Sequence, residues 1–579
     1  MSELLLLKKE DCKSCYKCIR ECALKSIRFS ENRAQIVERE CVYCGHCYVT
    51  CPQSAKEIRR DTDKAKALIA SGRPVIVSLA PSFIADFGVG GLDGIRPALL
   101  QLGFADVEET ARGAKIVKTE YERMIASGEH KLIISSCCHS VNLLIQKRYP
   151  QALPYLAKVD SPMLAHARSI KERVPGSAVV FIGPCISKKD EAERYGQVDC
   201  VLTFDELIDW MAEEGIELPA GEPDGTEARS RFFPTAGGII RSMDLDDGFS
   251  YIPIDGLRRC MDALEEIERG GMQNCFVEMS ACEGSCIGGP VMHRYHSSPI
   301  TCKTRVERYS GKSGRDFDDQ PAGSLHKPIQ YIGSGAVKPG EAAIQEVLHK
   351  LGKYRPEDEL NCGTCGYSTC REKAIAVCQG KADLSMCLPF LKARAESFSG
   401  AILDNTPNAI IAMDAKLIIQ QANEAASRLF GMENPREMVG MPIDAILGSV
   451  EYLQAMVGMP IDAILGSVEY LQAMDGERTD GPIRHYLPEI GKFVEETIAF
   501  DPEYNLVISI IKDITEETRR EQELDKERRR TAELADRVIE KQMRVAQEIA
   551  SLLGETTAET KIALTRLKDT IEPGGEVKR

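Results

Sequence analysis

The sequence predicts a multidomain protein that combines α/β and α+β folds. Its 579 residues are enough for several domains of about 100 to 200 residues each. Closely spaced cysteines gather in residues 12–51 and 362–387, while residues 73–350 alternate apolar strand-like runs with helical stretches. No cysteine follows residue 387. We therefore expect metal-binding modules on both sides of an α/β domain, followed by a C-terminal third of a different type.

Composition narrows the class of protein. The chain has 22 cysteines and a net charge of −15. Cysteines separated by only two or three other residues in so large a chain are typical of metal sites and of a reducing compartment, not of a disulfide framework. The acidic balance argues against nucleic acid as a partner. With no signal-peptide pattern and no apolar run of about 18 residues, we expect a cytoplasmic protein that does not enter a membrane.

The first metal-binding module covers residues 1–60. One spacing of four cysteines, C-x2-C-x2-C-x3-C, occurs there twice. The pattern resembles two-cluster ferredoxins, in which the fourth cysteine of each run binds the other cluster. The expected ligands of two [4Fe–4S] clusters are Cys12, Cys15, Cys18 and Cys51 for the first, and Cys41, Cys44, Cys47 and Cys22 for the second. A pair of zinc knuckles is the less favoured alternative.

A second module is expected over residues 351–393. It resembles the small iron–sulfur domain of corrinoid iron–sulfur proteins and electron-transport subunits. That resemblance implies one more [4Fe–4S] cluster, with the ligands Cys362, Cys365, Cys370 and Cys387. Cys378 lies between them and is expected to be a spare thiol. A structural zinc ion remains the alternative, because four cysteines also suit tetrahedral zinc.

The expected α/β domain covers residues 61–350. Strands are predicted near residues 74–80, 131–134, 178–183 and 275–279. Three of these four runs are followed within a few residues by cysteine. The cysteines are Cys137 and Cys138, then Cys185, and then Cys282 and Cys286. Groups at the carboxyl ends of strands converge on one crevice in open α/β sheets, so these thiols are expected to meet.

The same three loops resemble the signatures of the [FeFe]-hydrogenase large subunit. They read Ser-Ser-Cys-Cys at 135–138, Pro-Cys-Ile-Ser-Lys at 184–188, and Cys-Glu-Gly-Ser-Cys-Ile-Gly-Gly at 282–289. The resemblance implies a two-lobed α/β domain with an H-cluster, which is a [4Fe–4S] cubane joined to a diiron unit carrying CO, cyanide and a dithiolate bridge. Packing cysteines in an ordinary α/β domain are the alternative.

The resemblance also implies a role for each matched residue. Four thiols would hold the cubane, with Cys286 also bridging to the diiron unit. They are Cys138, Cys185, Cys282 and Cys286. Cys137 would pass protons to the bridging dithiolate, and Lys188 would donate a hydrogen bond to a cyanide ligand.

Several neighbours of these loops depart from the family pattern. Gly183, His139, Ser280 and Ser285 stand where the family has other residues. Such changes tune a metal site without removing it, so we expect low turnover. Glu120 and Glu122 are further candidates for proton transfer, although solvated surface positions are favoured for both. Four other cysteines are expected to be packing residues, namely Cys200, Cys260, Cys275 and Cys302.

Residues 394–515 resemble a PAS sensor domain. Residues 405–431 predict strand, turn, strand and helix, and residues 507–516 predict the last strand and the exit. Inside this region, residues 438–455 repeat without a mismatch as residues 456–473. We interpret the repeat as a duplication in which one copy loops out or extends a helix. A haem site at His485 is a less favoured possibility.

Residues 516–579 are expected to form a signalling helix and a docking tail. The residues Leu524, Thr531, Val538, Val545 and Leu552 are seven apart and predict one seam of a coiled coil. Glu527 and Lys541 interrupt a second seam three residues on, so a solvated single helix remains the alternative to a parallel homodimer.

Together these features predict a sensory or regulatory [FeFe]-hydrogenase that acts on H2 and protons. We expect a redox partner such as ferredoxin, and hydrogenase maturases that load the diiron unit. We also expect a separate phosphatase or kinase that docks on the helix or on residues 555–571. An iron–sulfur redox sensor without H2 chemistry is the main alternative, and a conventional ferredoxin-linked hydrogenase with an incidental tail is a third.

Overall fold

The structure is a computed structural model, which describes residues 4–553 except 9, 224–226, 293–298, 312–313, 322, 415, 448–481, 489, 502 and 505. It divides into two compact units, residues 1–391 and 392–579. Each unit is considered by itself below. Within the described residues, no helix is long and apolar enough to cross a membrane.

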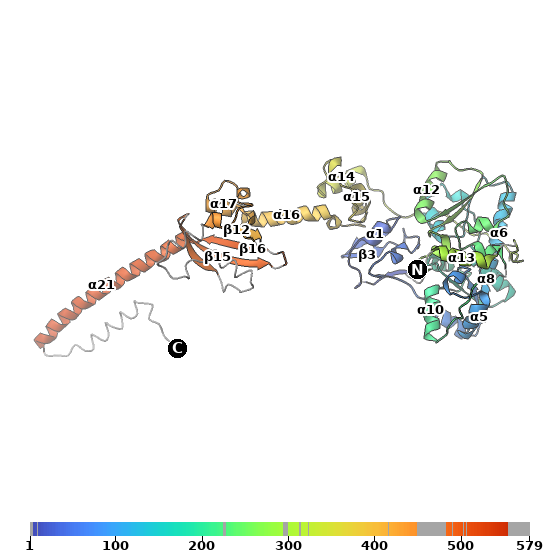
Figure 1. The fold of residues 1–579 in the computed structure, drawn as a ribbon, viewed down its shortest axis with the longest axis horizontal. Helices are drawn as coiled ribbons and strands as arrows, with labels where there is room; N and C mark the ends of the chain where they lie inside the picture. Colours follow the sequence, from blue (N-terminus) through green and yellow to red (C-terminus); the bar gives the residue numbers. More distant parts are fainter. Residues whose placement is uncertain are drawn as a thin grey trace. The chain divides into compact units, whose positions relative to one another are not determined.

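The N-terminal part of the first unit consists of two small two-stranded antiparallel sheets and two short helices (Figure 1). Strand β1 (Leu5–Leu7) pairs with β4 (Lys56–Ile58), and β2 (Ile27–Ser30) pairs with β3 (Arg33–Ile36). The helices are α1 (Lys17–Glu21) and α2 (His46–Val49), and each carries the third cysteine of one four-cysteine run. The two runs thus adopt the same loop-and-helix arrangement.

Two parallel sheets form the centre of this unit, which confirms the mixed α/β class. One has the order β6-β5-β8-β9 and the other β10-β11-β7. The strands of the first sheet are β5 (Val75–Leu79), β6 (Asp106–Glu109), β8 (Ala178–Gly183) and β9 (Cys200–Thr203). Those of the second are β7 (Leu132–Ile134), β10 (Ser250–Asp255) and β11 (Cys275–Ser280). All four predicted strands are therefore present, and their apolar residues are buried on both faces.

Helices surround the two sheets (Figure 1). The α-helices are α3 (Thr62–Ala70), α4 (Phe83–Asp86), α5 (Leu92–Gln101), α6 (Ala111–Ala126), α7 (His139–Arg148), α8 (Pro162–Arg173), α9 (Ser187–Tyr195), α10 (Phe204–Glu213), α11 (Gly238–Ser242), α12 (Leu257–Glu268) and α13 (Pro299–Ser310). Three single-turn helices accompany them, η1 (Leu153–Tyr155), η2 (Arg229–Phe232) and η3 (Ser285–Gly288). At the start of α10, Thr203 and Glu206 form a capping box.

The small cysteine module packs against the N-terminal part of the first unit. It comprises α14 (Glu341–Lys350), η5 (Pro356–Asp358), α15 (Cys370–Cys378) and η6 (Leu384–Met386). Arg20 donates to the carbonyl oxygens of Gly363 and Thr364, at 3.4 and 3.3 Å. Lys381 pairs with the buried carboxylate of Glu40 at 2.5 Å. The two cysteine modules therefore share one interface, although some 300 residues separate them along the chain.

The second unit contains a five-stranded antiparallel sheet with the order β13-β12-β16-β15-β14. Its strands are β12 (Ala409–Asp414), β13 (Ile419–Ala422), β14 (Ile483–Leu487), β15 (Lys492–Asp501) and β16 (Leu506–Asp513). The helix α16 (Leu388–Asn405) leads into the sheet, and α21 (Thr515–Leu553) leaves it. The other helices are α17 (Glu424–Phe430), η7 (Pro435–Glu437) and α18 (Asp444–Leu447). The second copy of the duplicated segment lies outside the described residues.

The contact between α6 and α8 depends on a glycine. A Cβ atom at Gly113 would lie 2.1 Å from the carbonyl oxygen of Pro162 and 2.7 Å from Cβ of His166. Because one neighbour is backbone and the other, His166, is fully buried, neither can easily move aside, and Gly113→Ala should lower the free energy of unfolding of the first unit by about 1–3 kcal/mol. Denaturant titration followed by circular dichroism measures this.

A matched control is Gly400→Ala in α16, where an added Cβ meets nothing within 4 Å. There the exchange should be neutral or stabilising by about 0.5–1 kcal/mol, because alanine favours a helix. Equal effects of the two substitutions would contradict the close approach of α6 and α8.

Candidate metal centre

The three cysteine loops meet around one cavity of about 120 Å³. Cys137 and Cys138 follow β7, Cys185 follows β8, and Cys282 and Cys286 follow β11. Strands β7 and β11 are neighbours in one sheet, while β8 belongs to the other. The cavity is lined by all five of these cysteines and by Lys188. The sequence-based expectation that the loops converge is therefore met by the structure, while the ligand roles stay predictions.

Four of these thiols lie close enough to repel one another as thiolates. Burial raises the pKa of Cys282 well above its usual value, and negative charge on Cys185, Cys138 and Cys286 raises it further. All 22 cysteines are free thiols, so no disulfide joins any of the four. Thiols that gather without bonding to one another suit a positively charged inorganic core, which would offset this repulsion.

The chemistry of these four thiols also bears on the kind of metal site. All four of these cysteine side chains line the cavity. A donor set of four thiols fits a [4Fe–4S] cluster, since soft thiolates are its usual ligands.

Cys137 faces the same cavity but belongs to a different network. Its Sγ lies 3.3 Å from the hydroxyl of Tyr121, which accepts a hydrogen bond from the Ser136 amide at 2.9 Å. Burial raises the pKa of the Cys137 thiol to about 12, although the Tyr121 hydroxyl and Lys188 favour its thiolate. At neutral pH Cys137 is therefore a protonated thiol that can donate.

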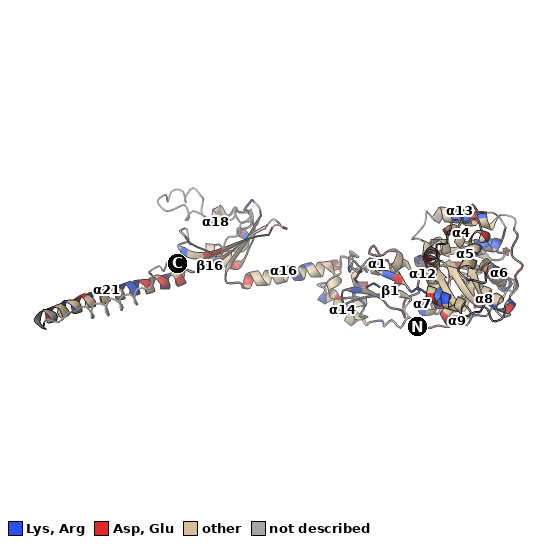
Figure 2. Cartoon of the chain, turned by 90° about the horizontal axis from the view of Figure 1, so that it is seen from below, with Lys and Arg blue, Asp and Glu red and all other residues tan. Residues whose placement is uncertain are grey.

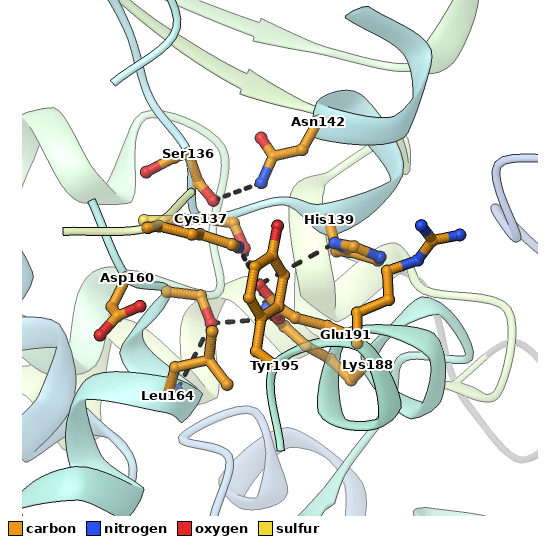
Figure 3. Close-up of polar contacts among 12 residues, drawn as sticks. Ser136, Cys137, His139, Asn142, Asp160, Leu164, Lys188, Glu191 and Tyr195 are labelled. Atoms are coloured by element: carbon orange, nitrogen blue, oxygen red, sulfur yellow. Dashed lines mark hydrogen bonds and ion pairs between the residues drawn. The ribbon is translucent and has the colours of Figure 1, made fainter. Parts of the chain in front are cut away.

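Lys188 is held by a buried group of charges (Figure 3). Its Nζ donates to the carbonyl oxygen of Cys137 at 3.0 Å and pairs with Glu191. Glu191 is fully buried, pairs also with Lys327 and accepts a hydrogen bond from Ser161 at 3.1 Å. Burial alone would raise the pKa of Glu191, but the two ammonium groups hold it well below its usual range. One carboxylate thus fixes two lysines from distant segments.

His139, one of the predicted departures, extends this network. Its Nε2 lies 2.6 Å from Oδ2 of Asp190, and Arg194 pairs with the same carboxylate. Burial lowers the pKa of His139, against the opposing effect of Asp190. The ring therefore joins the first cysteine loop to α9, which also carries Lys188 and Glu191.

Sequence reasoning missed Glu278, a buried carboxyl group that lines the cavity. It lies on β11, and its Oε2 accepts a hydrogen bond from the amide of Ile240 at 3.0 Å. Burial raises the pKa of Glu278 to about 7, although backbone amides of residues 237–240 favour the charged form. The sequence feature that could have indicated Glu278 is its position as the one charged residue in the apolar run of residues 275–279.

The residues considered for proton transfer from sequence lie elsewhere. Glu120 pairs with Arg123 on the surface of α6, and Glu122 accepts a hydrogen bond from the amide of Asp244. Neither lines the cavity. The four cysteines expected to pack, Cys200, Cys260, Cys275 and Cys302, are all buried in the main core.

The cysteines of the N-terminal module fall into the two expected groups. Thiolate charge on Cys51, Cys12 and Cys15 raises the pKa of Cys18, after the larger effect of burial. Burial likewise raises the pKa of Cys47, followed by Cys41, Cys44 and Cys22. The second group adjoins the main cavity, because Cys44 also lines it and interacts with both Cys138 and Cys282.

The four expected thiols of the small module line one further cavity, together with Tyr367 and Lys373. They are Cys362, Cys365, Cys370 and Cys387. Cys378 is exposed, lies outside this lining and donates to the carbonyl oxygen of Ala343 at 3.5 Å. Cys365 belongs to the same apolar cluster as Cys18, which places the small module beside the first N-terminal group.

Two parts of the chain match known family models. Residues 73–290 match the model described as "Iron only hydrogenase large subunit, C-terminal domain", and residues 358–389 match "Putative Fe-S cluster". The protein is a hydrogenase-like iron–sulfur protein. The second match favours an iron–sulfur cluster over zinc in the small module.

Curated relatives include a hydrogenase subunit and iron–sulfur assembly components. The NADP-reducing hydrogenase subunit HndD of Solidesulfovibrio fructosivorans is 25% identical over 355 residues, which are 48% of this chain and 60% of the relative. The cytosolic iron–sulfur assembly component 3 of Rattus norvegicus is also 25% identical, over 56% of this chain and 68% of the relative. Among solved structures, the [FeFe]-hydrogenase HydA1 from Chlamydomonas reinhardtii matches with a TM-score of 0.39, at 20% identity, over 48% of this chain and all of that one.

The buried charges around Lys188 yield a stability prediction. Glu191→Gln removes the only carboxylate that Lys188 and Lys327 both pair with in the described structure. It leaves two buried ammonium groups side by side, which should cost about 3–5 kcal/mol of unfolding free energy. The control is Glu193→Gln, also on α9, whose partner Arg59 lies near the surface, and that change should cost less than about 1 kcal/mol. Chemical denaturation compares the two, and equal costs would refute the role of Glu191.

Glu278 yields a prediction about pH. Because its folded pKa is raised from 4.5 to about 7, the folded protein binds a proton that the unfolded chain has released. Stability should therefore fall as the pH rises from 4.5 to 7, by up to about 1.4 kcal/mol per pH unit from this group. Glu278→Gln should remove that slope, whereas Glu265→Gln on the exposed face of α12 should keep it. Unfolding curves measured across this pH range check this. If the stability of Glu278→Gln changed with pH in the same way as that of the parent, Glu278 would not be the group responsible.

Proposed function

We propose that the protein activates H2 at an H-cluster and uses this chemistry for sensing or regulation. The convergence of five cysteines and Lys188 on one cavity carries the proposal. Cys138, Cys185, Cys282 and Cys286 would hold the cubane, with Cys286, in η3, also bridging to the diiron unit. When bound, the cluster supplies a Lewis-acidic iron at which H2 is split.

Protons would pass through Cys137. A thiol whose pKa is raised to about 12 keeps its proton at neutral pH and can deliver it at the cavity. The Tyr121 hydroxyl, 3.3 Å away, then stabilises the thiolate that remains. Glu278 lines the same cavity and, with a pKa of about 7, can exchange protons at neutral pH.

Lys188 would orient an anionic ligand of the diiron unit. Electrostatic attraction to Glu191 raises the pKa of Lys188 against the effect of burial, so the side chain stays an ammonium donor. Glu191 and the Cys137 carbonyl occupy part of its donor capacity, which leaves a further N–H for a ligand in the cavity.

Electrons would move along adjacent cysteine groups. Cys44 joins the second N-terminal group to the main cavity, and Cys22 lies in the apolar cluster that also contains Cys18 and Cys365. We propose that a redox partner such as ferredoxin exchanges electrons through these modules. Hydrogenase maturases would load the diiron unit.

The second unit would carry the signal. Its antiparallel sheet, with helices entering and leaving it, supports the proposed PAS module, and α21 supports the proposed signalling helix. A phosphatase or kinase would dock on this helix; the other proposed docking segment, residues 555–571, lies outside the described residues. Nε2 of His485 lies 3.6 Å from Oε2 of Glu496.

A second function remains open on a specific observation. Relatives of comparable similarity are named as iron–sulfur assembly components, and His139, Ser280 and Ser285 replace the residues that the hydrogenase pattern has beside the cavity. The alternative is an iron–sulfur protein that performs redox sensing without a diiron unit or H2 chemistry.

Infrared spectroscopy of protein expressed with hydrogenase maturases separates these functions. If the proposal is right, the matured protein shows CO and cyanide bands and consumes H2 with an artificial acceptor. Cys137→Ala should keep the bands but lower turnover by about 10²–10⁴-fold, because it removes a proton donor and no metal ligand.

Cys200→Ala is the matched control, because Cys200 is buried outside the cavity and should leave both bands and turnover unchanged. Iron–sulfur absorption without CO or cyanide bands would favour the alternative function. Loss of the bands in Cys137→Ala would show that Cys137 holds the cluster instead of moving protons.

A further inference from the structure

The helix α16 carries an apolar stripe that the structure leaves uncovered. Leu388, Leu391, Ala395, Phe398 and Ile402 follow one another at alternating intervals of three and four residues. On a helix of 3.6 residues per turn they fall within a stripe of about 80°. Leu391, Phe398 and Ile402 are 41, 68 and 51% exposed. This spacing is that of the a and d positions of a coiled coil.

The polar residues of α16 lie on its other faces. Lys392 and Glu396 form an ion pair along the helix at 3.7 Å. Ser397, with Ala393 one turn earlier, falls on the side opposite the stripe. Since a continuous row of exposed apolar side chains is costly to leave in water, the stripe indicates an interface.

The exit helix α21 repeats the spacing with one polar member. Intervals of three and four residues there join Ala535, Val538, Gln542, Val545 and Ile549. The two valines and the isoleucine are exposed. Gln542 carries no charge, and one polar residue in such a seam can fix the register of a pair at a cost in stability.

The seam of α21 has two rows. One contains Val538 and Val545, and the other, which lies four residues after each member of the first, contains Gln542 and Ile549 and has no charged residue from Ala535 onward. A row placed three residues after Val538 would instead contain the charged Lys541. Charged residues of both signs occupy the rest of the helix (Figure 2). The exposed apolar residues of both helices thus follow one pattern.

The sheet brings the two helices to one corner. Strands β12 and β16 are neighbours, and Ala409 pairs with Ile511. Asn405, the last residue of α16, lies four positions before this pair, and Thr515, the first of α21, lies four positions after it. The end of α16 and the start of α21 therefore lie at the same end of the sheet.

Hydrogen bonds anchor both helices there. The amide group of Asn423 donates to the carbonyl oxygens of Leu403 and Asn408, at 2.8 and 2.9 Å. The hydroxyl of Thr515 accepts from the amide of Phe493 at 3.0 Å. The end of α16 and the start of α21 are both fixed at this end of the sheet. One twofold axis passing there can therefore relate both helices to their counterparts in a second copy of the chain.

We propose that α16 pairs in parallel with α16 of a second copy of this chain, forming a second coiled-coil seam before the sheet. Two identical stripes are complementary by symmetry, and the dimer predicted through α21, on which this proposal partly rests, would raise the local concentration of the other pair. Each stripe has only five residues, so we expect neither helix pair to form stably without the other. The proposal does not rest on H2 chemistry.

Site-specific crosslinking of the full chain tests the pairing and its direction. The parent is Cys378→Ser, which removes an exposed native thiol outside the predicted clusters. Anaerobic treatment with a short bis-maleimide should join chains carrying Ala395→Cys or Ile402→Cys into covalent dimers. Chains with Ala393→Cys, on the opposite side of the helix, should stay at the parent's background.

Sedimentation equilibrium provides the second measurement. Phe398→Glu with Ile402→Glu should raise the dimer dissociation constant by about tenfold or more, the equivalent of losing at least one buried apolar side chain. Ser397→Glu should leave it unchanged. Crosslinking at 395 alone would show an antiparallel pair and overturn the proposal. Crosslinking no better than at 393, or a monomer, would show that another segment or a different protein covers the stripe.

Discussion

The structure depends on keeping the ends of strands from two different sheets within the width of one cluster. Strands β7 and β11 are hydrogen-bonded neighbours, but β8 belongs to the other sheet and no ladder joins it to them. The hydrogen bond from Lys188 to the Cys137 carbonyl and the contact between His139 and Asp190 supply that connection, because Lys188 and Asp190 both lie on α9, directly after the Cys185 loop. In a buried setting such charges are stable only together, so the site is held as a unit.

The parts that sequence could predict are those that short-range patterns encode. The four strands, the two runs of four cysteines and the long exit helix depend on apolar periodicity and fixed spacing, and the structure contains each at the expected residues. Glu278 and Lys327 could not be assigned, because their roles come from segments that only tertiary packing brings together. Likewise, nothing local in Arg20 or Lys381 indicates that they fasten the small module to the N-terminal part of the first unit.

The duplicated segment and the second seam of α21 show two different limits. An exact duplication of 18 residues does not indicate which secondary structure the extra copy adopts, because the same pattern simply occurs twice. The second copy lies outside the described residues. On α21, the residue three positions after Val538 is the charged Lys541, whereas the residue four positions after it is the uncharged Gln542, followed seven residues later by Ile549. Both intervals occur in any a/d stripe, and only the row that stays free of charge identifies the face.

The helix α16 is the segment of chain that runs from the first unit into the second. The helix begins one residue after Cys387, a predicted cluster ligand, and ends four residues before the first strand of the sheet. If Cys387 holds a cluster, as we propose, a change in its charge would act on the first turn of the helix, whose unpaired N–H groups respond most to negative charge. At the far end of the helix, the Asn423 side chain donates to the Leu403 carbonyl, and β12 pairs with β16, so a shift of α16 would reach the strand from which α21 leaves.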